Sequence, residues 1–167
     1  KPDAALQFIE RGLKADAGNL GLLLFKLKIY DEKKDYPNVE AVLRRIVEVA
    51  PDNREIHRAL VRFLVSRDRP ADAEAEMRVM ADASPDDVDL ALDVVRFISD
   101  TRGTAASRKE LERLVAAKPQ VTVYRLSLAQ LDFAEKKTDA AIAAVNAIIA
   151  KGEPKEDVHK AQLLLAA

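Results

Sequence analysis

The chain has 167 residues, 49% hydrophobic and 33% charged, which is sufficient for a folded domain with a sizeable buried interior. Its 27 basic and 28 acidic residues nearly cancel, whereas a nucleic-acid-binding protein normally has a marked basic excess. The absence of cysteine excludes disulfides and thiol chemistry, and no apolar run approaches the roughly 20 residues that insert into and span a bilayer. With few glycines and no tryptophan, the composition points to an all-helical protein.

Helical spacing of apolar residues begins near the first residue and recurs along the entire chain. A first helix is predicted within 1–19. Pairs of helices are predicted within 20–53, 54–87, 88–121 and 122–155, and a last helix within 156–167, giving about ten helices. Short polar breaks divide the two helices of each pair, at 31–35, 66–70, 100–104 and 135–139. Pro37 and Pro70 stand where a helix begins, a position at which a missing N–H costs nothing.

Proline marks the end of three of these pairs at a constant interval. The three prolines are separated by 34 residues and are Pro51, Pro85 and Pro119. Each lies between two helical stretches, so it indicates the end of one helix before the next begins. Ala17 takes this place after the single helix within 1–19, and Glu153, followed by Pro154, takes it in the last pair. The sequence therefore predicts helices that repeat every 34 residues.

The second helix of each pair has a slim residue, followed by larger apolar residues four and seven positions later; the helix within 1–19 has the same pattern except for Gly12 at the last place. Offsets of four and three lie on one helical face, so these residues predict the buried side of the helix. The slim residues are Ala5, Val39, Ala73, Ser107 and Ala141. The first helix of a pair follows short acceptor side chains that can cap it, such as Asn53 and Asp87.

This pattern resembles the tetratricopeptide repeat (TPR), a helix–turn–helix of 34 residues that ends in proline. The resemblance covers the entire chain, and Tyr30 takes the family's aromatic place in its first helix. The sequence departs from the family where Asp132 replaces an apolar residue. The resemblance implies an all-α, right-handed α-solenoid (superhelix) of antiparallel helix pairs, forming a single array over 1–167. Such repeats are stable only in series, because one repeat buries too little apolar surface alone.

Enzyme and metal motifs are missing from the sequence, so we expect no catalytic, cofactor-binding or metal-binding residues. No phosphate-binding loop, dinucleotide fingerprint, nucleophile elbow or zinc-protease motif is present. The acidic stretch from Asp86 to Asp93 lacks the glycine and closing glutamate of a calcium loop. His57 and His159 have no second ligand at helical spacing, so each is expected to be a packing or surface residue.

The resemblance further implies that partners bind in a concave groove lined by the first helix of each pair. Carried onto this sequence, the partner-binding groove comprises Leu24, Lys28, Arg58, Arg62, Leu92, Arg96, Leu126 and Gln130. The cations Lys28, Arg62 and Arg96 are 34 residues apart, which favours an acidic protein or peptide partner. The alternative is a solvated face neutralised within its own helices, because Asp93 and Arg96 are an i,i+3 pair, as are Glu55 and Arg58.

The expected function is therefore a non-catalytic protein-binding scaffold. The alternatives are an accessory arm of a larger enzyme or regulator, and a structural spacer that stacks end to end with itself. Both ends carry half a repeat, and the chain opens on Lys1 without methionine, so we expect a piece of a longer TPR protein. Alanine and arginine suit a bacterial source, in which the cytoplasm and the periplasm or envelope are equally compatible compartments.

Overall fold

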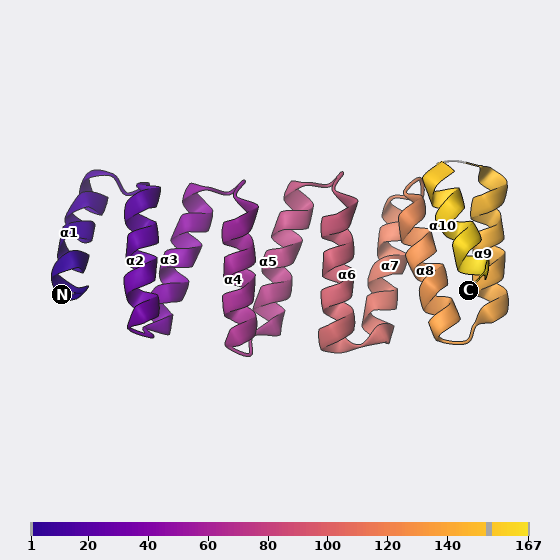
Figure 1. The fold of residues 1–167 in the computed structure, drawn as a ribbon, viewed down its shortest axis with the longest axis horizontal. Helices are drawn as coiled ribbons and strands as arrows, with labels where there is room; N and C mark the ends of the chain where they lie inside the picture. Colours follow the sequence, from indigo (N-terminus) through magenta and orange to yellow (C-terminus); the bar gives the residue numbers. More distant parts are fainter. Residues whose placement is uncertain (1, 153–154, 167) are drawn as a thin grey trace. The chain divides into compact units, whose positions relative to one another are not determined.

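The computed structural model describes residues 2–152 and 155–166, and these fold into α-helices and turns without a strand in either range. Figure 1 shows the helices in chain order. Their bounds are α1 Pro2–Ala15, α2 Leu20–Glu32, α3 Tyr36–Val49, α4 Arg54–Ser66, α5 Pro70–Ala83, α6 Val88–Arg102, α7 Thr104–Ala117, α8 Thr122–Ala134, α9 Thr138–Lys151 and α10 Lys155–Ala166. The predicted all-α fold is confirmed within these ranges; the helix stop predicted at Glu153 and Pro154 lies outside the described residues.

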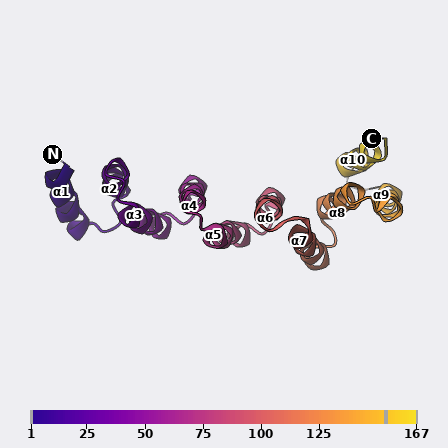
Figure 2. The same ribbon diagram turned by 90° about the horizontal axis from the view of Figure 1, so that it is seen from below.

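The helix boundaries repeat every 34 residues. α1 and the second helices of the pairs (α3, α5, α7 and α9) begin at residues 2, 36, 70, 104 and 138, and each has 14 residues. The first helices α2, α4, α6 and α8 begin at residues 20, 54, 88 and 122. Seen nearly end-on in Figure 2, α2 lies beside α3, α4 beside α5, and α8 beside α9.

Short polar side chains set several helix starts. Asn19 accepts a hydrogen bond from the backbone N–H of Leu22, and Asn53 accepts one from the N–H of Glu55 and another from that of Ile56. Each bond satisfies an N–H that has no partner within its own helix. At α3 and α5 a proline stands in the first turn, where its missing N–H does no harm.

The turn inside a helix pair has a recurring backbone conformation. Lys34, Asp68 and Lys136, again 34 or 68 residues apart, all have positive φ, between 55° and 60°. In each case the N–H of the following residue donates to a carbonyl five positions earlier, as Asp35 N–H does to the Tyr30 carbonyl at 2.9 Å. This is the helix-ending motif in which glycine is usually found. The chain therefore makes tight turns at a conformational cost to three non-glycine residues.

The chain forms two compact units, residues 1–90 and 91–167, termed here the N-terminal unit and the C-terminal unit. In the N-terminal unit the slim residues Val39 and Ala73 are buried, so α3 and α5 approach their neighbours closely. Arg69 at the start of α5 donates to Glu40 of α3 at 2.5 Å. Burial alone would raise the pKa of Glu40, but hydrogen bonds from Arg44 and Arg69 outweigh it and hold that pKa below 4.5.

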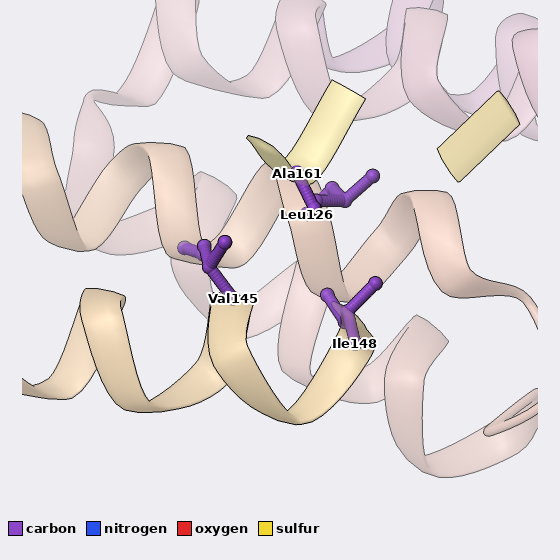
Figure 3. Packing of buried hydrophobic residues seen from close by; sticks show 5 residues of the cluster. Leu126, Val145, Ile148 and Ala161 are labelled. Atoms are coloured by element: carbon purple, nitrogen blue, oxygen red, sulfur yellow. The ribbon is translucent and has the colours of Figure 1, made fainter. Parts of the chain in front are cut away.

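The C-terminal unit is built around a cluster contributed by α8, α9 and α10 (Figure 3). Its buried members are Leu126, Ala129, Val145, Ile148 and Ala161. Asp132, which stands at an expected apolar place, accepts a hydrogen bond from Arg108 at 2.6 Å. Arg108 also donates to Glu135 at 2.8 Å, which joins α7 to the end of α8. The carboxylate of Asp132, which stands where an apolar residue was expected, is thus paired with an arginine of the preceding helix α7.

Candidate functional site

The N-terminal unit contains a cavity of about 500 Å³ between α2, α3 and α4. We call it the α2–α4 cavity. Its walls are mainly apolar and include Leu24, Leu27, Leu43 and Phe63. Lys28 and Arg62 also line it, so two successive members of the predicted cation series lie at one cavity. A mainly apolar concave surface with a few charged groups is the usual composition of a binding site.

The two cations at this cavity differ in their partners. Lys28 lies 3.9 Å from Glu32, and both side chains are exposed, so solvent screens most of this interaction. Arg62 is exposed and has no ion-pair or side-chain hydrogen-bond partner among the residues that the structure describes. Asp31 also lines the cavity, leaving two cations against one carboxylate. The cavity therefore has a surplus positive charge and one guanidinium with all its donors available.

The other predicted cations are engaged within their own helices. Arg58 donates to Glu55 at 2.8 Å, and Arg96 donates to Asp93. Both contacts are the i,i+3 pairs anticipated from the sequence. Arg58 does not line the α2–α4 cavity. Arg96 belongs to the C-terminal unit, so it is described only by its own surroundings, in which it is exposed and paired.

The three remaining groove residues, all in the C-terminal unit, differ in accessibility. Leu92 is half-buried and Gln130 is exposed. Leu126 is only 4% exposed and belongs to the cluster with Val145 and Ile148, onto which Leu164 of α10 also packs. It is therefore core and unavailable as a partner contact in this structure, because α10 packs against α8 and α9.

A buried polar pair in the N-terminal unit was not anticipated. His57 Nδ1 lies 2.5 Å from Glu76 Oε1, and His57 Nε2 lies 2.8 Å from the Pro51 carbonyl oxygen. His57 and Glu76 are both buried, and they join α4 to α5. The 34-residue repeat could have indicated that both residues are buried. His57 and Glu76 stand 34 residues after Leu23 and Val42, which are buried in the preceding helix pair. Because both ring nitrogens are hydrogen-bonded inside the protein, the pair serves packing.

Neither metal binding nor membrane crossing is indicated by side chains in the described ranges. No group of three or more histidine, cysteine, aspartate or glutamate side chains is placed to hold a metal ion there. Within the same ranges no helix combines the length and the apolar character needed to cross a membrane.

Comparison with known proteins gives structural likenesses only. No protein-family model matches the sequence, and no curated protein matches it. Among solved structures, MamA is similar at 15% identity over 99% of this chain and 91% of its own, with a TM-score of 0.48. A tetratricopeptide repeat protein from Parabacteroides merdae is similar at 16% identity over 99% of this chain and 66% of its own, with a TM-score of 0.46.

YrrB, described as a TPR protein with an unusual peptide-binding site, is similar at 12% identity. The match covers 96% of this chain and 84% of YrrB, with a TM-score of 0.47. The architecture of the present chain rests on its own helices, whose pairs begin every 34 residues and bury the slim residues Val39, Ala73, Ser107 and Ala141. By this arrangement the chain is a tetratricopeptide-like helical repeat protein.

Proposed function

We propose that the chain is a non-catalytic interaction module that holds a segment of a partner protein in the α2–α4 cavity. The segment carries a carboxylate next to an apolar side chain. Arg62 is the observation that carries this proposal: it is exposed, lines the cavity, and has no ion-pair partner among the described residues. Its counterpart Arg96 is already bound to Asp93.

The chemistry of the cavity favours a carboxylate over other ligands. A guanidinium presents donors in a planar fork that matches the two oxygens of a carboxylate. Lys28 adds a second positive charge, since its own pairing with Glu32 is long and exposed. Leu24, 42% exposed, and Phe63 supply apolar surface next to these cations. A bound segment would therefore place an acidic side chain against the two cations and an apolar side chain against Leu24 and Phe63 at the same time.

Fluorescence anisotropy with defined peptides tests the proposal. The probe is a labelled peptide in which leucine adjoins aspartates, and its matched control has asparagine in place of each aspartate. We expect saturable binding of the acidic peptide, weakened by salt, and little binding of the amide peptide. Arg62→Gln should weaken binding roughly 10- to 150-fold, corresponding to about 1.5–3 kcal/mol for a hydrogen bond to a charged group.

Arg96→Gln is the matched control variant. It removes the same charge from an exposed arginine at the equivalent repeat position, and it is expected to leave peptide binding unchanged. Equal weakening by both variants would show that net charge alone attracts the peptide. That result, or the absence of saturable binding by the acidic peptide, would refute the α2–α4 cavity as the site.

A further inference from the structure

Two cavities of the N-terminal unit lie at equivalent places in successive repeats. One, of about 270 Å³, lies between α1, α2 and α3, and we call it the α1–α3 cavity. The other, of about 490 Å³, lies between α3, α4 and α5, and we call it the α3–α5 cavity. Corresponding lining residues are Leu13, Ala17 and Arg45 in the first and, each 34 residues later, Val47, Pro51 and Val79 in the second. The two cavities can therefore be compared position by position.

An arginine of the chain itself spans the first cavity. Arg45 of α3 lines the α1–α3 cavity, and its guanidinium donates to the backbone carbonyl of Ala17, beyond the end of α1, at 3.3 Å. The same guanidinium donates to Glu48 at 2.8 Å. Valine takes this place in the α3–α5 cavity: Val79 is 53% exposed and has neither the length nor the donors to repeat these contacts. The second cavity thus lacks the arginine that the first has, and it is the larger of the two.

Carboxylates predominate around the α3–α5 cavity. Glu48 and Asp52 line it, and Asp52 is exposed without an ion-pair partner among the residues that the structure describes. The cation in its lining, Arg54, is already engaged, because it donates to Asp87 at 2.6 Å. Asp82 of α5, which stands 34 residues after Glu48, is exposed and has no ion-pair partner in the described ranges either. The cavity therefore combines apolar walls with carboxylates that a cation from outside could pair.

We propose that the α3–α5 cavity receives an arginine side chain of a partner protein, in the place that Arg45 takes in the α1–α3 cavity. The aliphatic part of that side chain packs on Val47 and Val79, and its guanidinium pairs with Asp52 at the rim. Glu48 adds a second carboxylate, since its own contact with Arg45 is between exposed side chains and is screened by solvent. This site is separate from the α2–α4 cavity, with which it shares no lining residue within the described ranges, and it takes a segment of opposite charge.

Fluorescence anisotropy with a second labelled peptide tests this inference. In the probe a single arginine is flanked by leucines and every other residue is uncharged. In its matched control citrulline, which has nearly the same shape without the charge, replaces the arginine. We expect saturable binding of the arginine peptide, and binding of the citrulline peptide that is roughly 10-fold weaker or more. Arg62→Gln, which alters the α2–α4 cavity, should leave the affinity for the arginine peptide unchanged.

Two pairs of variants locate the bound peptide. Val79→Arg restores the residue of the preceding repeat, and Val65→Arg, its matched control, adds the same charge at another exposed valine, on α4 and outside the cavity. Asp52→Asn removes a carboxylate of the rim, whereas Asp86→Asn removes the exposed carboxylate 34 residues later, which does not line the cavity. We expect Val79→Arg and Asp52→Asn each to weaken binding roughly 10-fold or more, and both controls to leave it unchanged. Since all four side chains are exposed, circular dichroism should show the same helix content in each variant.

Equal affinity for the arginine and citrulline peptides would overturn the proposal, as would the absence of saturable binding. Equal weakening by Val79→Arg and Val65→Arg, or by Asp52→Asn and Asp86→Asn, would show that net charge alone attracts the peptide, which also contradicts a site in this cavity. An arginine peptide that binds the Val79→Arg chain as tightly as wild type would show that it docks elsewhere on the molecule.

Discussion

The buried pair of His57 and Glu76 can be exchanged for the apolar pair that the preceding repeat uses at the same places. In the structure, Nδ1 of His57 lies 2.5 Å from Glu76 Oε1, and the two residues are 3% and 9% exposed. Leu23 and Val42 stand 34 residues earlier and are both buried. The substitutions His57→Leu and Glu76→Val therefore give α4 and α5 the apolar residues that α2 and α3 have at the same repeat positions.

The single and double variants should differ strongly in stability. Glu76→Val alone leaves the buried His57 Nδ1 without its hydrogen-bond partner, which costs about 1–3 kcal/mol for an unsatisfied buried polar group. The double variant removes both polar groups and refills the space with apolar atoms. It loses only the hydrogen bond from Nε2 to the Pro51 carbonyl, worth about 1 kcal/mol. We expect it to be within about 1 kcal/mol of wild type.

Urea unfolding of the wild type, the two single variants and the double variant gives the coupling free energy directly. A coupling well above experimental error, with the double variant more stable than Glu76→Val, is the expected outcome. Additive losses, with the double variant the least stable of the four, would refute the reasoning. In that case the two residues contribute independently, and the neighbouring repeat is no guide to packing at this position.

Two further stability predictions follow from the turn geometry and from Glu40. Lys34 has positive φ, so Lys34→Gly should raise the free energy of unfolding by about 0.5–1 kcal/mol, because relief of the left-handed conformation exceeds the added freedom of the unfolded chain. An unchanged or lower thermal midpoint would contradict this. Glu40 has a folded-state pKa below its ordinary 4.5, so it stabilises the fold above that pH and loses this contribution as pH falls through the lower folded value. Glu40→Gln should therefore flatten the acid dependence of urea stability, and an unaltered slope below pH 4.5 would contradict the assignment.

Features of the fold that depend on residues close together in the sequence could be predicted from the sequence alone. The prolines, the slim residues and the helix caps act within one or two helical turns, so they indicated the 34-residue interval and the all-α fold. The pairs Glu55–Arg58 and Asp93–Arg96 form for the same reason, because residues three apart always meet on one helical face. The resemblance to the tetratricopeptide repeat also placed Lys28 and Arg62, which are 34 residues apart, in one predicted groove, and both line the α2–α4 cavity.

Contacts between helices decided which of these residues are accessible. Leu126 shares its repeat position with the half-buried Leu92, yet α10 packs against α8 and makes it core. His57 meets Glu76 and Arg108 meets Asp132 across 19 and 24 residues of sequence, distances at which helical spacing predicts nothing. Local spacing sets where a helix lies and which face is apolar, whereas burial and charge pairing depend on the particular side chains that each neighbouring helix presents.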